Sequence, residues 1–190
     1  MKDYSSYFIG IPLPQKYQQD FEDLQTDISQ ISPLFKTTHP KTPHITVCYL
    51  DKQSQSALSR IAEDVKKYLE ILKGTKLKVS GFGYFGEDKP RILFSDVQYP
   101  PQLQEFNKLI SKSLSIYCAA DNNLPFHPHV TVAWVGDPKA QEAFKASLLE
   151  LSTRLKKVNW VFDIIEVVLY GVDSSKKPEY HEKLISIAVK

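Results

Sequence analysis

The sequence predicts an α+β fold built from two related halves. Segments with alternating apolar residues are interspersed with segments whose apolar residues recur every three or four positions, the patterns of strands and amphipathic helices. Two strand-like segments, 43–47 and 128–132, share the pattern Pro-His-apolar-Thr-Val. Their histidines, His44 and His129, are 129 − 44 = 85 residues apart, close to half of the 190-residue chain. This interval indicates a duplicated unit with approximate two-fold symmetry.

The first half begins with a β-rich, alternating segment, Ser6–Pro12, which predicts a strand that ends at its prolines. Apolar residues at three- and four-residue steps predict helices over 15–31 and 54–72, and Gly74 is a suitable end for the second helix. The strand 43–50 lies between these helices. Two further strands are expected at 76–83 and 91–97, joined by the turn-rich segment 83–90.

The second half repeats the scheme. Prolines open a predicted helix over 100–117, and Asp137 followed by Pro138 predicts an N-cap and the first position of another helix. The remaining expected elements are a polar loop at 119–123, a strand at 128–135, a helix continuing to 155, one long strand or two over 158–172, and a last strand at 181–190. No interdomain linker is recognisable, so one domain spanning 1–190 with two lobes around a shared site is expected.

Composition sets the class of protein. The chain is 42% hydrophobic and 24% charged, which predicts a globular protein with a substantial core. The net charge of +2 is too small to indicate nucleic-acid binding by itself. Cys48 and Cys118 lack metal-ligand spacing and are too few for a disulfide framework, so free thiols are expected. Because no signal-peptide pattern or long apolar segment is present, a cytoplasmic monomer without membrane association is expected.

The two repeated strands each present an imidazole and a hydroxyl. Residues i and i+2 of a strand point to one face, so His44 and Thr46 share a face, as do His129 and Thr131. By the same alternation, Ile45, Val47 and Tyr49 are expected to face the other way. A proline precedes each histidine, and proline is tolerated at the first residue of a strand, which places each histidine near a strand end beside a cleft.

These two histidine–threonine pairs suit a reaction at a phosphorus atom. Two imidazoles on opposite sides of a phosphate can act as general base and general acid near neutral pH. The threonine hydroxyls can donate hydrogen bonds to the non-bridging oxygens, where charge builds in the transition state. This division of roles needs no metal or cofactor, and none is expected.

Other chemistries have weaker support. His127 and His129 could ligate a metal from one face of the strand, but no carboxylate or cysteine stands at ligand spacing. A G-x-S-x-G nucleophile turn is absent, and "GFGYFG" lacks the spacing of a phosphate-binding glycine loop.

The paired motifs resemble those of the two-histidine (2H) phosphoesterase superfamily, which includes bacterial 2′-5′ RNA ligase-like proteins and cyclic nucleotide phosphodiesterases. "PHITVCYL" and "PFHPHVTVAWV" match its two motifs, and "YFIGIPLP" and "SGFGYFGEDKPRILFSDV" resemble its first strand and its central loop with the following strand. The resemblance implies two pseudo-symmetric lobes of antiparallel sheet with flanking helices around a central cleft.

The same resemblance implies site roles and a reaction. His44 and His129 would be the catalytic pair, and Thr46 and Thr131 would bind the phosphate oxygens. The reaction would be metal-independent hydrolysis of 2′,3′-cyclic phosphate or 2′-5′ phosphodiester bonds in RNA ends or small nucleotides. RNA ligation or repair of tRNA halves, and a non-catalytic RNA- or nucleotide-binding module, remain alternatives. The sequence does not assign the base and the acid.

Substrate-binding residues are predicted around these four. His127 stands where many bacterial members carry arginine, and could contact phosphate or lie exposed in a loop. Arg91 is a candidate for holding a second phosphate. The other candidates, for base stacking or for bordering the cleft, are Tyr7 or Phe8, Tyr84 or Phe85, Trp134, Tyr180, His181 and Lys41.

Overall fold

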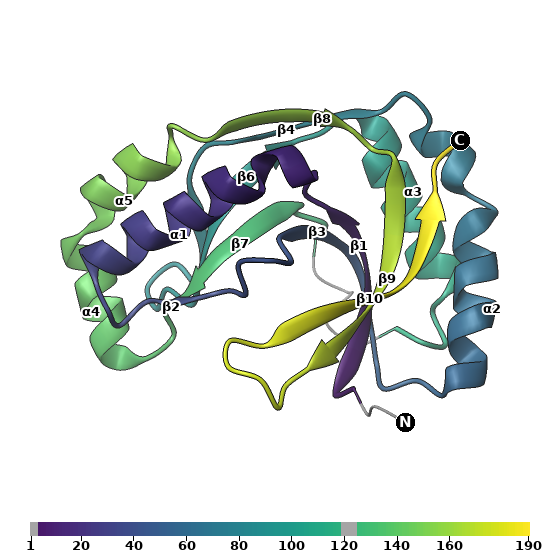
Figure 1. The fold of residues 1–190 in the computed structure, drawn as a ribbon, viewed down its shortest axis with the longest axis horizontal. Helices are drawn as coiled ribbons and strands as arrows, with labels where there is room; N and C mark the ends of the chain where they lie inside the picture. The colour runs from purple at the N-terminus through teal and green to yellow at the C-terminus, as the bar shows by residue number, and fades with distance from the viewer. Residues whose placement is uncertain (1–3, 119–124) are drawn as a thin grey trace.

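The structure, a computed structural model, describes residues 4–118 and 125–190 (Figure 1). The predicted loop at 119–123 lies outside the described residues. The first part of the chain forms β1 (Ser6–Pro12), η1 (Gln15–Tyr17), α1 (Gln18–Ile31), β2 (Lys36–Thr37), β3 (His44–Leu50), α2 (Gln55–Lys66), η2 (Leu69–Leu72), β4 (Lys76–Ser80), β5 (Gly83–Phe85) and β6 (Ile92–Gln98). The second part forms α3 (Pro101–Ser113), β7 (His129–Trp134), α4 (Pro138–Ala146), α5 (Leu148–Leu155), β8 (Asn159–Asp163), β9 (Glu166–Asp173) and β10 (Tyr180–Ala188).

Most predicted elements are confirmed, and the differences are local. The helix expected over 54–72 divides into α2 and η2, and the helix following Asp137 divides at Ser147 into α4 and α5. Asp137 is the predicted N-cap, since its carboxylate accepts a hydrogen bond from the Lys139 N–H at 3.0 Å. The segment 158–172 forms two strands, β8 and β9.

The expected turn segment 83–90 contains a strand. β5 pairs with β6, and Gly83 lies opposite Phe94. A Cβ atom on Gly83 would lie 2.2 Å from the Phe94 ring, so only glycine allows the ring to cover this position. Gly86 then turns the chain with φ +95°, a conformation that L side chains rarely adopt. Gly83 therefore allows the position of the Phe94 ring, and Gly86 allows the turn of the loop.

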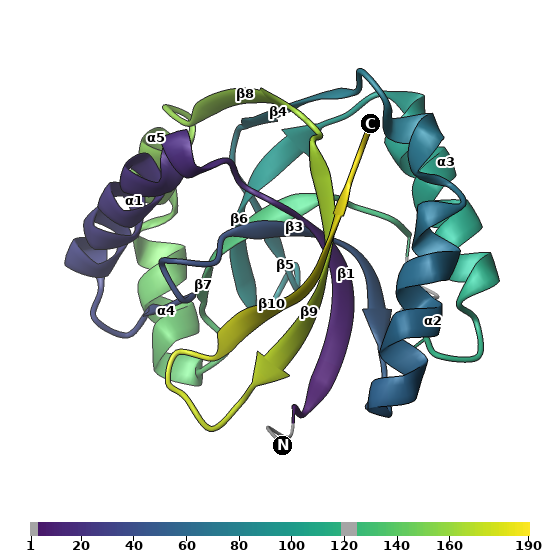
Figure 2. The same ribbon diagram turned by 45° about the vertical axis from the view of Figure 1, so that its right-hand side comes forward.

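The strands form one curled antiparallel sheet with the order β10-β9-β1-β3-β7-β6-β4-β8, to which β2 adds beside β7 and β5 beside β6. The bilobal α+β fold is confirmed, and the two lobes join edge to edge where β3 meets β7. Four strands of the order lie on each side of this seam. Figure 2 shows the curvature of the strands around the space in front of it.

The lobes do not coincide with the sequence halves. β9 and β10 complete the lobe of β1 and β3, whereas β4 and β6 join β7 in the other lobe. The helices cross over too: α1 follows β1 but lies with α4 and α5, and α3 follows β6 but lies with α2 (Figures 1 and 2). The duplicated units therefore exchange elements, which ties the two lobes into one body.

Matching β-bulges interrupt the two strands at the seam. Ile9 pairs with Cys48 and Gly10 with Thr46, which leaves Val47 as the extra residue of β3. The β6–β7 pairing skips Val132 in the same way. A bulge breaks the alternation of faces, so both strands share the burial pattern intermediate, buried, intermediate, buried, buried, exposed.

The bulge corrects the prediction for Tyr49, which is 47% exposed and does not face the core. Cys48 takes the buried position instead. In β7, Trp134 occupies the position equivalent to Tyr49 and is 50% exposed. The two bulges thus return one aromatic residue per motif to the open face of the sheet.

Helix side chains bind the carbonyls of both bulge residues. Asn107 of α3 donates from Nδ2 to the Val47 carbonyl at 2.7 Å. The Val132 carbonyl accepts from the Thr38 N–H at 3.0 Å and from Gln25 Nε2 of α1 at 3.4 Å. Because a bulge displaces backbone groups from the ladder, these donors satisfy acceptors that the sheet leaves exposed.

Within the described ranges, no helix is long and apolar enough to cross a membrane.

Candidate active site

The site is built on the register between β3 and β7. Ile45 pairs with Val130 in antiparallel orientation, and both side chains are fully buried. In this register His44 lies across from Thr131, and Thr46 lies across from His129. Directly opposed side chains on one face have Cβ atoms about 4.5–5.5 Å apart. One strand pairing therefore brings both H-x-T motifs into a single four-residue arrangement on the open face of the sheet.

Both histidines are held through the same kind of hydrogen bond. His44 Nδ1 lies 2.8 Å from the Thr42 carbonyl, and His129 Nδ1 lies 2.7 Å from the His127 carbonyl. A carbonyl only accepts, so each Nδ1 carries the proton, and each Nε2 is left for the cleft. The prolines between acceptor and histidine shape both turns in the same way.

Phenylalanines from the flanking strands support the two imidazoles. Phe8 of β1 stacks on His44 with ring centroids 4.5 Å apart, and Phe94 of β6 lies 4.9 Å from the His129 ring. Phe85 of β5 adds an edge contact to His129 at 4.9 Å. Each imidazole is thus held against phenylalanine rings, although Phe8 and Phe94 stand at different positions of their strands, opposite Tyr49 and Thr131.

The environment of His44 favours its neutral form. Burial, with the charge of His181 as the next cause, lowers the pKa of His44 to about 3. The His181 ring meets the His44 ring nearly at right angles, with centroids 4.8 Å apart. Burial also lowers the pKa of His181 to about 4, and His39 is the next contributor. His44 therefore stays neutral over the physiological range in the free protein.

The environment of His129 is different, because a carboxylate lies near it. Burial lowers the pKa of His129 as well, and the charge of His127 adds to this shift, whereas the hydrogen bond to the His127 carbonyl and the charge of Asp96 oppose it. Asp96 lies opposite His129 in the β6–β7 ladder and binds His127 Nε2 at 3.1 Å. The two histidines thus have similar hydrogen bonds but different charged neighbours, because the Asp96 carboxylate lies beside His129.

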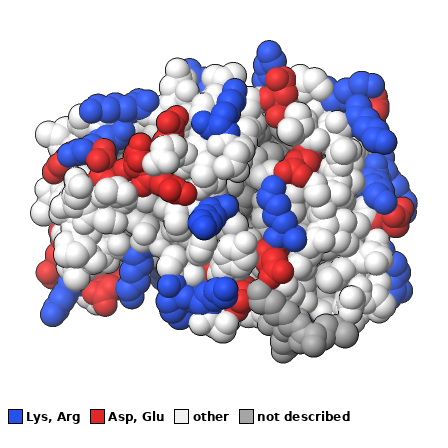
Figure 3. Space-filling model, in the orientation of Figure 1, with Lys and Arg blue, Asp and Glu red and all other residues white. Residues whose placement is uncertain are grey.

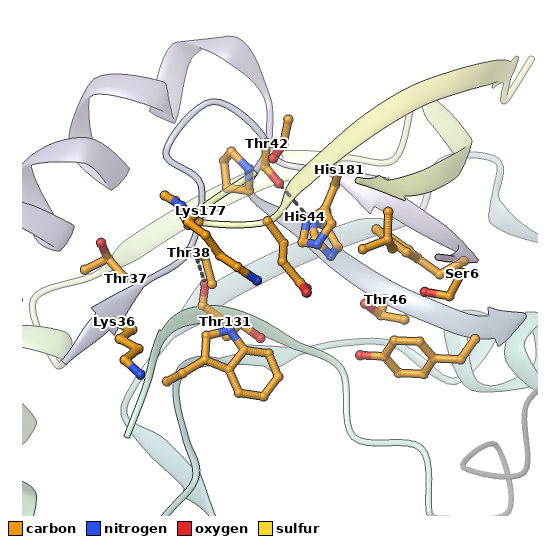
Figure 4. Close-up of a pocket in the computed structure, with 17 residues that line it drawn as sticks. Ser6, Lys36, Thr37, Thr38, Thr42, His44, Thr46, Thr131, Lys177 and His181 are labelled. Atoms are coloured by element: carbon orange, nitrogen blue, oxygen red, sulfur yellow. Dashed lines mark hydrogen bonds between the residues drawn. The ribbon is translucent and has the colours of Figure 1, made fainter. Parts of the chain in front are cut away.

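A cavity of about 470 Å³ opens over the seam (Figure 4). His44, Thr46 and Thr131 line it, and Tyr49 and Trp134 lie at its apolar part. Its polar lining also includes Ser6, Lys36, Thr37, Thr38, Thr42, Lys177, Glu179 and His181. His129 is outside this lining but shares the face of Thr131, and its charge reaches His44, where it contributes to the lowered pKa. The arrangement can hold a phosphate between two imidazoles and two hydroxyls.

Comparison with known proteins agrees with this geometry. The model of the 2′-5′ RNA ligase superfamily matches residues 13–175, most of the chain. The chain belongs to the 2′-5′ RNA ligase superfamily. The resemblance to 2H phosphoesterases drawn from the motifs is thereby confirmed.

Individual relatives extend the comparison. The RNA 2′,3′-cyclic phosphodiesterase of Geobacillus stearothermophilus is 29% identical over 180 residues, which are 93% of this chain and 55% of that protein. The chain thus spans about half the length of this curated relative. The crystal structure of TT0787 of Thermus thermophilus has a TM-score of 0.72 at 16% identity, over 97% of each chain. Escherichia coli LigT in complex with ATP has a TM-score of 0.71 at 16% identity, over 99% of each chain.

Trp134 is one of the aromatic residues that were predicted to bind substrate, and it lines the cavity. Tyr7 is only 6% exposed and belongs to the core, because β1 alternation turns Phe8, not Tyr7, toward the cleft. Tyr84 packs against Phe144 with centroids 5.0 Å apart, so it also faces away. Phe85 contacts His129 but does not line the cavity.

The polar candidates lie mostly outside the cavity lining. Arg91 is exposed at the start of β6, and Lys41 is exposed before β3. Tyr180 packs against His39 with centroids 4.8 Å apart, so its neighbour His181 is the residue of β10 that enters the cleft. His127 pairs with Asp96 and contacts Phe85 and Phe94. Its position is therefore beside His129, not within the cavity.

Several lining residues escaped prediction from sequence. Tyr49 was assigned to the wrong face because the bulge has no local sequence signal. Lys36 lies in β2, a strand of two residues, and Lys177 lies in the connection between β9 and β10; neither residue belongs to a motif. Among the described residues, no group of three or more His, Cys, Asp or Glu side chains is placed to hold a metal ion, so His127 and His129 gain no third ligand.

Proposed function

We propose that the cleft hydrolyses 2′,3′-cyclic phosphate ends of RNA by metal-independent acid–base catalysis. The observation that carries the proposal is the β3–β7 register, which sets each motif histidine across from the threonine of the other motif. The Geobacillus relative is named as an RNA 2′,3′-cyclic phosphodiesterase, and LigT has been crystallised with phosphate and with 3′-AMP. A 2′-5′ phosphodiester or a small nucleotide with the same phosphate would suit the same four side chains.

His44 is the general base in this proposal. Its low pKa keeps Nε2 unprotonated, and the Thr42 carbonyl fixes the tautomer with Nε2 toward the cleft. Water loses a proton to His44 Nε2 while its oxygen bonds to phosphorus. A lowered pKa makes a base weaker but available at every physiological pH, and the anionic phosphate of a bound substrate raises that pKa toward neutrality.

His129 is the general acid. Asp96 and the substrate phosphate both favour its protonated form, so His129 holds a proton more readily than His44. It donates this proton to the ribose oxygen as the bond from phosphorus to that oxygen breaks. The product is a ribose monophosphate with one free hydroxyl; His44 then releases its proton to solvent, and His129 takes one up from solvent.

The threonine hydroxyls stabilise the charge on phosphorus. Neither Thr46 Oγ1 nor Thr131 Oγ1 donates a hydrogen bond to another described residue, so both are free to donate to the non-bridging oxygens. Preorganised donors of this kind typically contribute a factor of about 100–1,000 each to kcat. Their strand positions fix them without a further ordering step.

The experiment that tests the proposal measures turnover of a 2′,3′-cyclic-phosphate-ended oligonucleotide in EDTA. His44→Ala and His129→Ala should each abolish most of the activity, while the wild type keeps its rate in EDTA. His39→Ala is the matched control, because His39 lies near the cleft but does not line it. Loss of wild-type activity in EDTA, or full activity in either catalytic variant, would contradict the mechanism.

Ligation of RNA ends is the second candidate, supported by the superfamily to which the chain belongs. It follows the same steps with a 5′-hydroxyl in place of water: His44 takes the proton of that hydroxyl as its oxygen bonds to phosphorus, and His129 protonates the ribose oxygen that leaves. Incubating RNA halves that carry 2′,3′-cyclic phosphate and 5′-hydroxyl ends distinguishes the two, since only ligation produces a longer chain. Binding of such ends without any turnover would instead indicate a non-catalytic RNA-binding module.

A further inference from the structure

One wall of the cleft joins a cation to an aromatic side chain. Lys36 of β2 pairs directly with Trp134 of β7, and both residues line the cavity. Directly paired residues of antiparallel strands project to the same face, so the two side chains leave the sheet side by side. The bulge at Val132 is what turns Trp134 to this face, where half of its surface is open to solvent.

A second lysine enters from the opposite side. Lys177 belongs to the connection between β9 and β10, and in Figure 4 its side chain extends into the space between His44 and Thr131. Within residues 4–118 and 125–190, neither Lys36 nor Lys177 forms an ion pair. Glu179 is the acidic residue of the lining, so the two lysines leave the wall with a positive balance.

This positive character is local to the wall. Figure 3 shows Lys and Arg side chains interspersed with Asp and Glu over the face that it displays, in keeping with the small net charge of +2. An aromatic face with unpaired cations beside it is the combination that binds single-stranded nucleic acid, by stacking a base and tracking the backbone.

We propose that Lys36 and Trp134 form a second-nucleotide subsite, which binds the nucleotide adjoining the one that carries the scissile phosphate. The base of that nucleotide stacks on Trp134, and the phosphate that joins the two nucleotides contacts Lys36, while Lys177 reaches the scissile phosphate between His44 and Thr131. The inference rests on the proposed function, because it places the subsite relative to the phosphate that is cleaved. Its consequence is selectivity for RNA ends over mononucleoside 2′,3′-cyclic phosphates.

The test compares a dinucleotide that ends in a 2′,3′-cyclic phosphate with a mononucleoside 2′,3′-cyclic phosphate. The wild type should have the higher kcat/KM for the dinucleotide. In Trp134→Ala the ratio of the two kcat/KM values should fall by about ten-fold, within the range that loss of one stacked base produces. Equal losses on both substrates, with the ratio intact, would overturn the subsite.

The lysines have a separate readout in the salt dependence. Each of Lys36→Ala and Lys177→Ala should reduce the slope of log kcat/KM against log salt by about 0.7 for the dinucleotide, as expected for one lost phosphate contact to a single strand. Lys41→Ala and Lys176→Ala are the matched controls, since they remove the same charge from nearby positions in the chain that do not line the cavity. Slopes that fall equally in the controls would contradict a specific phosphate contact.

Binding separates failure of the subsite from failure of the proposed function. If the wild type turns over neither substrate, the proposed function fails, and the subsite is tested with 3′-phosphorylated dinucleotide and mononucleotide. Quenching of tryptophan fluorescence by the dinucleotide, and tighter binding of the dinucleotide that is lost in Trp134→Ala and largely kept in Trp134→Phe, would support the subsite. Trp160 is buried and supplies a constant background. Equal affinity for the two ligands would overturn it.

Discussion

The hydrogen bond from Asn107 to the Val47 carbonyl connects a helix to the geometry of the site, and Asn107→Leu tests its role. The substitution keeps the approximate volume of the side chain and removes the donor. Asn107 Nδ2 lies 2.7 Å from the Val47 oxygen, and Val47 is the residue that the β1–β3 register leaves unpaired. Loss of the donor therefore leaves a carbonyl unsatisfied in a part-buried position.

The expected magnitude combines two opposing effects. An unsatisfied buried acceptor costs about 1–3 kcal/mol, and leucine in place of asparagine within a helix returns about 0.5 kcal/mol of helix propensity. The variant should thus be destabilised by about 0.5–2.5 kcal/mol, which for a protein of this size lowers Tm by about 1–10 °C. Because the bulge orients Thr46 on one side and Tyr49 on the other, kcat should fall as well.

The assay is thermal unfolding followed by circular dichroism, together with kcat on a cyclic-phosphate-ended oligonucleotide. Gln104→Leu is the matched control, since Gln104 lies on the exposed face of the same helix. If Asn107→Leu and Gln104→Leu had the same Tm and the same kcat, the amide would have no role in holding the bulge, and the reasoning would be refuted.

Three further predictions follow from the site. Thr46→Val should lower kcat by about 100- to 1,000-fold with little change in Tm, and an undiminished kcat would show that this hydroxyl does not reach the transition state. The alkaline limb of kcat/KM should fall below pH 6.5, because the free protein lowers the pKa of His129, whereas the limb of kcat should lie at higher pH, because bound phosphate raises that pKa. Alkaline limbs of kcat/KM and kcat at the same pH would contradict the assignment of His129 as the general acid. The folded state lowers the pKa of His44 to about 3 and of His181 to about 4, so the unfolded chain binds more protons, and stability should be lost as pH falls from about 6.5 toward these values. His181→Gln should lose less Tm between pH 7 and pH 4.5 than the wild type, and an identical loss would exclude His181 as a source of acid sensitivity.

Local patterns in the sequence were sufficient to locate the catalytic candidates. The spacing of His44 and Thr46 places them on one face of a strand by backbone geometry alone, and the same holds for the second motif. The N-cap at Asp137 and the strand limits of β1 are equally local, since each depends on neighbouring residues and turn chemistry. These features were predicted correctly because no distant contact competes with them.

The tertiary structure decided how the two motifs meet. Only the register of Ile45 against Val130 shows that each histidine faces the other motif's threonine, and a pairing across 85 residues leaves no trace in either segment alone. The exchange of strands and helices between the lobes was hidden for the same reason. The two halves are similar, so the sequence does not say which lobe each copy completes.

The bulges at Val47 and Val132 show most clearly what the sequence leaves open and the tertiary structure decides. A β-branched residue in a strand is compatible with regular pairing or with a bulge, and the choice depends on the partner strand and on amide donors from distant helices. The choice then decides whether Tyr49 lies in the core or in the cleft. Likewise, Lys36, Lys177 and Asp96 are ordinary charged residues in sequence, and only the folded chain sets two of them in the cleft and the third beside His129. The sequence by itself determined which groups are the catalytic candidates, because their types and spacing are local. Their partners, their electrostatic asymmetry and the walls of the cleft depend on long-range packing, which only the tertiary structure specifies.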